Sequence, residues 1–385
     1  MKFVPLGEVA TIDRATVNPN EIPGDTQYVG LEHITKFSRE VHPVTAETAR
    51  LSSTKHRFDQ HQILYGKLRP YLAKIATPDF DGVCSTDILP LTPCESVDRS
   101  YLYYFLSQPS KVREVSKQAT GANLPRVKPA ALENLKIPLP PLDEQRRIAA
   151  ILDKADAIRQ KRRQIFEHLE DLSQSLFLHF FKDHAETCAF SSLVDEFRYG
   201  TSNRSVDTGY PALRIPNVVQ SRLNLADIKY VPVSERELEK LKLQNGDLLF
   251  VRTNGTLENV GRCSIFNKNK VETSSNIDSP WIYASYLIRA RLKDGTSPEF
   301  IHGFFNSTKG RASIRKSSRT SAGQYNINIH GISNVQIPSV PKNKQIEFAA
   351  LSARIDALSN EAAKQISIAD EVFAALQSRA FRGEL

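Results

Sequence analysis

The chain is poor in the residues that build redox and metal centres. Its 385 residues include four cysteines, one methionine and one tryptophan. The four cysteines, Cys84, Cys94, Cys188 and Cys263, form no CxxC pair, so we expect reduced, mostly packed thiols and no disulfide framework. His184 and Cys188 have i, i+4 spacing, but a structural zinc ion needs four ligands and no second pair is near. We therefore predict no metal site.

Long apolar runs are also missing. No run reaches the ~18 residues that a membrane helix needs, and residues 1–8 lack the apolar core of a signal peptide. We therefore expect a cytoplasmic protein that makes no contact with a membrane. Hydrophobic residues make up 40% and charged residues 24%, which is typical of globular chains, and the length suggests two or three domains. The net charge of +8 permits a polyanionic partner without proving one.

Motifs for cofactor and phosphate chemistry are absent as well. No GxGxxG fingerprint follows an expected strand, and no GxxxxGK[ST] loop occurs. Amino-methyltransferases of nucleic acids carry an Asn/Asp-Pro-Pro-aromatic motif, whereas residues 278–281 read Asp-Ser-Pro-Trp. Asp79 follows Pro78, but no Asp/Glu-x-Lys follows within the next thirty or so residues, as a nuclease would require. We therefore predict no catalytic residue and no cofactor in this chain.

What is present is an internal repeat. Residues 132–181 align without a gap to residues 332–381, and eleven of these 50 positions are identical. Both copies begin with prolines that a helix interior does not tolerate, after which Asp143 and Asn343 stand where N-cap residues would lie. We therefore predict two equivalent helices, the first running from Glu144 to Phe181. The identical residues of the first copy are Asn134, Ile137, Pro138, Pro141, Gln145, Ala149, Ala150, Asp156, Ala157, Leu176 and Phe181.

Apolar residues in both predicted helices recur at alternating spacings of three and four, a heptad pattern sustained for about four repeats. This pattern, which we call the heptad seam, favours an antiparallel coiled-coil pair over two ordinary amphipathic helices. A helix of 38 residues would be about 57 Å long, a length that corresponds to roughly 16 base pairs of duplex DNA. The predicted seam residues are Ile148, Ile151, Ile158, Leu169, Leu172, Phe348, Leu351, Ile355, Leu358 and Val372.

The block before each helix looks rich in strands. Residues 62–69 and 246–253 are apolar runs that turn basic, and residues 84–91 and 284–290 look like further strands. Short helices are expected at 101–107 and 300–306. The order along the chain is therefore a variable block, a helix, a second variable block and a second helix, with the two halves related by a pseudo-two-fold axis.

The residues that open the first helix carry a resemblance to a known family. Residues 137–149 read Ile-Pro-Leu-Pro-Pro-Leu-Asp-Glu-Gln-Arg-Arg-Ile-Ala. This stretch, with residues 121–123 and 380–385, resembles specificity subunits of type I restriction-modification systems. The second opening, residues 337–345, keeps only Pro338, Pro341 and Gln345 of the motif.

The resemblance implies an α+β fold with two target recognition domains separated by a coiled coil of two long antiparallel helices. We expect recognition domains at 1–143 and 186–343, and helical spacers at 144–185 and 344–385. Each recognition domain would recognise one half of a bipartite DNA sequence, and the helical pair would set the spacer. The implied partners are double-stranded DNA, two methyltransferase subunits that use S-adenosylmethionine, and restriction subunits that use ATP and Mg²⁺.

Basic residues are concentrated at equivalent places in the two repeats. Residues 99–128 contain six basic residues and one acidic residue, and residues 302–330 contain five basic residues and no acidic residue. Such clusters are usually solvated faces, but their repetition favours contact with nucleic acid. Arginine can donate two hydrogen bonds to guanine, and asparagine or glutamine can bond twice to adenine. The DNA-binding candidates are Lys67, Arg69, Lys117, Arg126, Lys128, Arg214, Arg252, Asn254, Arg315, Lys316, Arg319, Gln324 and Asn326.

Two alternatives to a DNA-specificity subunit stay open at this point. One is a coiled-coil adaptor whose globular parts bind protein, with the basic charge incidental. The other is a self-contained DNA-modifying enzyme, which would need a methyltransferase domain that the motifs do not provide.

Overall fold

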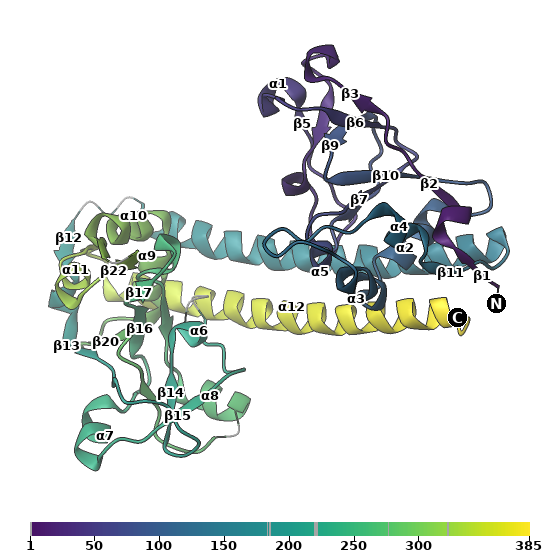
Figure 1. Ribbon diagram of the computed structural model, residues 1–385. Helices are drawn as coiled ribbons and strands as arrows, with labels where there is room; N and C mark the ends of the chain where they lie inside the picture. The colour runs from purple at the N-terminus through teal and green to yellow at the C-terminus, as the bar shows by residue number, and fades with distance from the viewer. Residues whose placement is uncertain (1, 183, 185, 219–221, 276, 322) are drawn as a thin grey trace. The chain divides into compact units, whose positions relative to one another are not determined.

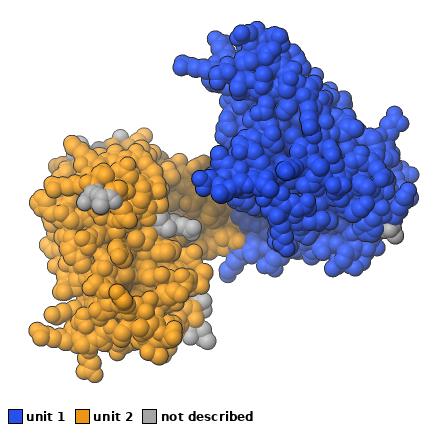
Figure 2. Space-filling model, viewed as in Figure 1, with its two compact units in different colours: residues 1–163, 364–385 blue, residues 164–363 orange. Residues whose placement is uncertain are grey.

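Two long helices and two strand-rich regions make up the protein (Figure 1). The computed structural model describes residues 2–182, 184, 186–218, 222–275, 277–321 and 323–385. Helix α5 spans Leu142–Phe181 and helix α12 spans Lys342–Arg382. The chain divides into two compact units, of which unit 1 comprises residues 1–163 and 364–385 and unit 2 comprises residues 164–363 (Figure 2). Each unit contains a globular part, which we call its head, and half of each long helix.

The head of unit 1 is built on three sheets. A two-stranded sheet pairs β1 with β11, a four-stranded sheet has the order β2-β10-β7-β8, and a five-stranded sheet has the order β3-β6-β9-β4-β5. The strands are β1 (Phe3–Pro5), β2 (Ala10–Ile12), β3 (Thr16–Val17), β4 (Gln27–Val29), β5 (Val44–Thr45), β6 (Lys55–Phe58), β7 (Ile63–Gly66), β8 (Ile75–Ala76), β9 (Gly82–Ser85), β10 (Ile88–Pro93) and β11 (Lys136–Pro138). The helices are η1 (Leu6–Glu8), η2 (Pro19–Glu21), η3 (Leu31–His33), α1 (Ala46–Ala49), η4 (Pro70–Leu72), α2 (Arg99–Leu106), α3 (Pro109–Lys117) and α4 (Pro129–Glu133).

The described residues of the unit 2 head form four sheets. Their orders are β12-β23, β13-β20-β16-β18, β15-β14-β19 and β17-β22-β21. The strands are β12 (Thr187–Ala189), β13 (Val194–Tyr199), β14 (Tyr210–Leu213), β15 (Lys229–Val231), β16 (Leu248–Val251), β17 (Thr253–Asn254), β18 (Cys263–Ile265), β19 (Ile282–Tyr283), β20 (Leu287–Leu292), β21 (Arg319–Ser321), β22 (Gln324–Asn326) and β23 (Gln336–Pro338). The helices are η5 (Phe190–Leu193), α6 (Ile215–Val218), α7 (Glu235–Leu241), η6 (Leu257–Asn259), α8 (Lys268–Ser275), α9 (Pro298–Asn306), α10 (Thr308–Ser317) and α11 (Ile329–Ser333).

The two heads share a central topology, as the repeat predicts. Each has a two-stranded antiparallel sheet whose second strand, β11 or β23, precedes a long helix, and each has a four-stranded antiparallel sheet with equivalent strand order. The predicted short helices are confirmed as α2 and α9. The segments predicted as single strands at 84–91 and 284–290 are wrong in detail, because each contains the turn between two strands, β9 and β10 or β19 and β20.

The long helices are antiparallel in both units. In unit 1, Arg163 of α5 donates to Asp370 of α12 at 2.9 Å, and Arg147 donates to the carbonyl of Leu385 at 2.8 Å, so residue numbers rise along one helix and fall along the other. In unit 2, the ring of Phe181 lies 5.1 Å from that of Phe348. Arg222 lies 2.8 Å from Glu170 of α5 and 3.6 Å from Asp356 of α12, which gives the same opposed numbering. The predicted antiparallel arrangement of the two helices is confirmed within each unit.

Aromatic side chains fasten each head to its halves of the helices. In unit 1, the ring of Phe381 lies 4.9 Å from Tyr101 of α2. In unit 2, Phe181, its partner in the repeat, lies 4.8 Å from Phe300 of α9. These side chains belong to the main apolar core of each unit. Burial of several aromatic rings at each junction supplies a large apolar contact that single helices in water would lack.

The register of the predicted heptad seam is partly wrong. Ile148, Phe348 and Ile355 are buried, and Ile151, Leu169 and Leu351 are intermediate. The other four predicted seam residues are about half exposed: Ile158 at 54%, Leu172 at 49%, Leu358 at 58% and Val372 at 50%. On α5 the buried positions Leu152, Asp156 and Arg159 lie one residue after the predicted ones, and this offset is already present in the third turn of the helix.

Polar residues explain why the apolar pattern gave the wrong register. The buried positions of the long helices include Asp156 and Arg159 of α5, and Ser359 and Gln377 of α12, each 8% exposed or less. Arg159 Nε lies 3.0 Å from Asp370, and its guanidinium stacks over the Phe373 ring at 4.1 Å. Burial raises the pKa of the Asp156 carboxyl despite the nearby Arg159. A search for apolar spacing passes over these positions.

The predicted N-caps are also wrong, and a glutamine in the first turn of α5 bonds to the head instead. Helices α5 and α12 begin at Leu142 and Lys342, so Asp143 and Asn343 lie inside the first turn. Gln145 is fully buried: its Nε2 donates to the carbonyls of Ser96 and Pro140 at 3.0 and 2.9 Å. Its Oε1 accepts from the N–H of Asp98, the N-cap of α2, at 2.9 Å.

The second copy of this glutamine makes a smaller set of the same contacts. Gln345 accepts from the N–H of Ser297, the N-cap of α9, and donates to the carbonyl of Val340. The duplicated glutamine thus ties the start of a long helix to the first short helix of its head, which explains its identity in both repeats.

Replacing Gln145 with alanine should lower the free energy of unfolding of the full chain by about 2–4 kcal/mol, because buried donors and acceptors lose their partners. Gln345→Ala should cost less, since that side chain is half buried and makes two such bonds. Chemical denaturation followed by circular dichroism measures both. Asp143→Ala is the matched control, because the Asp143 side chain is 98% exposed. A loss for Gln145→Ala no larger than that of the control would contradict this account of the motif.

Candidate nucleic-acid interface

Three of the predicted DNA-binding residues come together where β7 ends in unit 1. Lys67 follows β7, and its carbonyl accepts from the N–H of Val127 at 3.0 Å. The N–H of Arg69 donates to the carbonyl of Pro125 at 2.7 Å. Arg126 lies between these two partners, so residues 67–69 and 125–127 run side by side. A central strand of the head therefore ends in a basic surface built from two distant segments.

An acidic residue that the sequence patterns did not indicate joins this group. Asp87, in the turn between β9 and β10, accepts from Arg126 through both carboxylate oxygens, Nε to Oδ1 at 2.9 Å and Nη2 to Oδ2 at 3.0 Å. Lys67 Nζ lies 3.8 Å from the same carboxylate. The hydrogen-bonded Arg126 guanidinium lowers the pKa of Asp87 below its ordinary value, although burial opposes this. We call Lys67, Arg69, Asp87 and Arg126 the first cluster.

The backbone beside the first cluster adopts left-handed conformations at residues with side chains. Phe37, Arg69 and Ala73 have φ angles of 54°, 52° and 45°. The N–H of Phe37 donates to the carbonyl of Ala73 at 3.3 Å, which joins the tip of one loop to the other. Phe37 is 53% exposed and Tyr71 is 49% exposed. Such strain on non-glycine residues is concentrated at functional sites, and sequence patterns gave no sign of it.

In unit 2, the corresponding basic strand end leads into a three-stranded sheet. The sheet has the order β17-β22-β21 and contains Asn254, Gln324, Asn326 and Arg319, so four predicted residues share one surface element. Arg252, between β16 and β17, lies with its guanidinium 4.8 Å from the Tyr199 ring centroid. An arginine that stacks on an aromatic ring has a defined orientation.

Side chains within this sheet bond to one another. Gln324 Oε1 accepts from the hydroxyl of Thr253 at 3.0 Å, and Asn326 Nδ2 donates to the carbonyl of Gln324 at 3.2 Å. Tyr286, in the turn before β20, is 59% exposed, and the sequence analysis did not single it out. We call Arg252, Asn254, Tyr286 and Asn326 the second cluster.

The remaining predicted residues lie on several elements. Lys117 ends α3, Lys128 precedes α4, and Lys316 is near the end of α10; all three are exposed. Arg315, also on α10, donates to both oxygens of Glu258 at 2.7 Å.

Arg214 is not placed with the second cluster by the contacts of the described residues. It follows β14 in a separate sheet, where its Nη2 donates to Asp227 at 2.7 Å. The Arg214 guanidinium lowers the pKa of the Asp227 carboxyl.

Two arginines of the basic stretches face inward and so do not contribute to a basic surface. Arg99 donates to the carbonyls of Gln62 and Pro78 at 2.9 and 2.7 Å. Arg311 is 6% exposed and donates to the carbonyl of Val260 at 2.7 Å; burial lowers its pKa to about 10. Counting charges along the sequence therefore overestimated the surface charge of both stretches.

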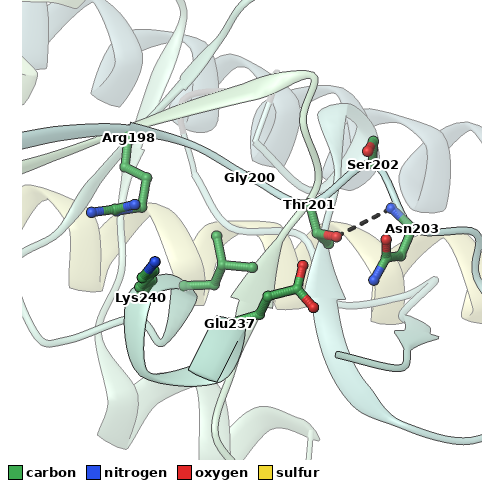
Figure 3. Close-up of a pocket in the computed structure, with 8 residues that line it drawn as sticks. Arg198, Gly200, Thr201, Ser202, Asn203, Glu237 and Lys240 are labelled. Carbon is green, nitrogen blue, oxygen red and sulfur yellow. Dashed lines mark hydrogen bonds between the residues drawn. The ribbon is translucent and has the colours of Figure 1, made fainter. Parts of the chain in front are cut away.

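A cleft of about 240 Å³ lies in unit 2 between the end of β13 and α7 (Figure 3). Its lining combines Arg198 and Lys240 with Glu237, and the hydroxyl of Thr201 accepts from the N–H of Asn203 at 3.1 Å. None of its lining residues is a cysteine or a histidine. Within the described residues, no group of three histidine, cysteine, aspartate or glutamate side chains could hold a metal ion. The four cysteines are free thiols, and burial raises the pKa of Cys84 and Cys263.

Comparisons with known proteins bear on this arrangement. The model of the type I restriction modification DNA specificity domain matches residues 1–170. The specificity subunit of the type I restriction enzyme EcoKI from Escherichia coli K12 is 30% identical over 319 residues, covering 77% of this chain and 67% of the relative. The chain belongs to the family of type I specificity subunits.

Further members and solved structures agree with this assignment. The StySPI specificity subunit of Salmonella potsdam is 25% identical over the same shares of the two chains. The S subunit structure from M. genitalium has a TM-score of 0.59 at 13% identity, covering 99% of this specificity subunit and 96% of that chain. A chain from a study of type I R-M complex assembly has a TM-score of 0.57 at 18% identity, with 100% and 98% covered. These two structural matches establish the fold that the sequence analysis predicted.

Within the described residues, no helix combines the length and apolar character needed to cross a membrane.

Proposed function

We propose that this specificity subunit recognises a bipartite sequence in duplex DNA, one half with each head. As a member of its family the chain is a DNA-recognition subunit, and catalysis belongs to other subunits. The observation that carries the proposal is the pair of polar clusters, each at the end of a central strand in its own head and each built from different side chains. Because the two heads carry different side chains at equivalent positions, they can recognise half-sites of different base sequence.

The ion pairs within these surfaces do not stand against contact with DNA. Arg126 and Arg315 are 44% and 49% exposed at the side chain, Glu258 is 52% exposed, and Asp87 is 24% exposed. Exposed ion pairs contribute about 0–1 kcal/mol, so a phosphate or a base edge can replace or extend them at little cost. We assign Arg69, Lys117, Lys128, Arg315, Lys316 and Arg319 to phosphates, because all six are exposed and basic.

We further propose that α5 and α12 set the spacer between the half-sites. Helix α5 has 40 residues and is therefore about 60 Å long. In this reading the recognition domains are residues 1–143 and 186–343, with helical spacers at 144–185 and 344–385. The proposal rests on the continuity of α5 and α12 and on their antiparallel contacts inside each unit.

The four exposed residues of the predicted heptad seam supply a docking surface for partner subunits. Ile158 and Val372 lie in unit 1, and their partners in the repeat, Leu358 and Leu172, lie in unit 2, all four about half exposed. We propose that each pair binds one modification subunit, a methyltransferase that uses S-adenosylmethionine. Restriction subunits using ATP and Mg²⁺ would complete the enzyme, which would act in the cytoplasm where the DNA lies.

Replacing Ile158 and Val372 with aspartate should abolish co-purification of one modification subunit, because a charge in an apolar contact is left without a partner. Stability of the chain should change by about 0.5 kcal/mol or less, since both side chains are exposed. Co-expression followed by size-exclusion chromatography measures the stoichiometry. Lys154→Asp serves as the control, because it introduces the same charge at another exposed position of α5. Full retention of both subunits by the double variant would contradict this docking surface.

Selection from a random duplex library tests the proposed function directly. The full chain, in the complex with which it purifies, should enrich two specified segments separated by an unspecified spacer of fixed length. A single contiguous consensus would overturn the bipartite reading, and the absence of any enrichment would favour the protein-binding adaptor.

A further inference from the structure

The first and second clusters occupy equivalent positions in the two heads. The N–H of Lys67 donates to the carbonyl of Asp87 at 2.9 Å. The N–H of Arg252 donates to the carbonyl of Tyr286 at the same distance. Each donor follows the central strand of its four-stranded sheet, β7 or β16, and each acceptor lies in the turn before β10 or β20. Asp87 in the first head therefore corresponds to Tyr286 in the second.

Arg126 and Asn326 are a second equivalent pair. Arg126 exchanges backbone hydrogen bonds with Thr120 at 2.9 and 3.0 Å, so its main chain is fixed. Asn326 lies in β22, paired with Arg319 on one side and Thr253 on the other. Both positions directly precede a residue whose N–H donates to the carbonyl at the end of the central strand. The two heads thus place an arginine and an asparagine at one structural position.

The contact with Asp87 fixes the Arg126 guanidinium and leaves part of it unused. A guanidinium has five N–H groups, and Asp87 takes the one on Nε and one on Nη2. Among the described residues, Arg126 makes one other hydrogen bond. Its Nη1 donates to the carbonyl of Leu124 at the long distance of 3.4 Å. The edge that carries Nη1 and Nη2 therefore still offers two parallel donors, which is the arrangement that pairs with O6 and N7 of guanine.

We infer that Arg126, oriented by Asp87, recognises a guanine in the half-site bound by the first head. The inference rests on the proposed function and makes it specific. Stability does not account for the pair, because an exposed ion pair contributes little to folding. A fixed orientation does matter for recognition, since it removes the cost of ordering a long side chain on binding. Asn326, at the equivalent position, carries the amide that pairs with adenine.

The experiment compares variants of the full chain, in the complex with which it purifies, by selection from the random library and by measured affinities. Arg126→Ala should lower the preference for guanine at one position of the first half-site by about 5- to 150-fold, the range for one bidentate base contact. Arg126→Asn, which copies the second head, should move the preference at that position from guanine toward adenine. Asp87→Asn should weaken the guanine preference while leaving Arg126 in place.

A matched control exists on the helix. Arg147 makes the same two-bond contact with Glu144, at 2.7 and 2.7 Å, outside both clusters. Glu144→Gln should leave the base preference at every position unchanged.

Several results would overturn the inference. If Arg126→Ala weakens binding equally for all sequences, Arg126 is a phosphate contact. If Asp87→Asn only strengthens binding uniformly, its carboxylate merely repels DNA. Failure of the proposed function would look different, because the wild-type chain would then enrich either a single contiguous consensus or no sequence at all. Circular dichroism of each variant establishes that a loss of preference is not a loss of folding.

Discussion

Raising the salt concentration from 50 to 200 mM is expected to weaken binding of duplex DNA by this specificity subunit about 10³-fold. The six exposed basic residues that we assign to phosphates would each release a counterion, giving a slope near −5 in a plot of log affinity against log salt. They are Arg69, Lys117, Lys128, Arg315, Lys316 and Arg319. Fluorescence anisotropy with a labelled duplex measures this slope.

Single substitutions measure how much each residue contributes to the salt dependence. Lys316→Gln should reduce the slope by about 0.9 and weaken binding to all sequences alike, because a phosphate contact carries no base information. Arg99→Gln should leave the slope unchanged if it folds, since Arg99 donates inward to the carbonyls of Gln62 and Pro78. A wild-type slope near zero would instead support the protein-binding adaptor.

Inserting seven residues at the midpoints of both α5 and α12 is expected to cost at least about 10³-fold in affinity for the original target. The insertion lengthens each helix by about 10 Å, which corresponds to roughly three base pairs of DNA. Seven residues make almost two full helical turns, so the two ends of the helix rotate relative to each other by only about 20°. Three base pairs rotate the DNA by nearly a third of a turn, so the two heads would no longer face their half-sites together. Specific affinity would fall toward non-specific affinity.

A longer insertion serves as the control for damage to the helices. Twenty-two residues add about 33 Å, close to six helical turns and to one turn of DNA. Binding should then return on targets whose spacer is about ten base pairs longer. Library selection and anisotropy measure both variants. An unchanged spacer preference after either insertion would refute the role proposed for α5 and α12.

The repeat and its helices could be predicted from sequence because each depends on local rules. Prolines fix where α5 and α12 begin to within two residues, and apolar spacing predicts their length. The register between the helices could not be predicted in the same way. It depends on Arg159, Asp370 and Phe373, whose contacts join residues more than 200 positions apart.

The candidate site shows the same division. Residue type and position were enough to single out Lys67, Arg69 and Arg126, since basic residues after a buried strand lie at a surface. Asp87 was missed because its role requires three chain segments to meet, which spacing along the sequence does not reveal. Conversely, Arg311 was counted with the surface charge although it is buried.

The amino-acid sequence by itself determined the duplication, the two long helices and the family, because these are written in periodicity and in a short motif at the start of α5. Only the tertiary structure decided which face of each helix is buried and which stays exposed, since that depends on contacts such as Arg159 with Asp370 between the helices. It also decided that Arg126 is held by a carboxylate and Asn326 is not. Both differences arise from contacts between residues far apart in the sequence, which local sequence patterns do not reveal.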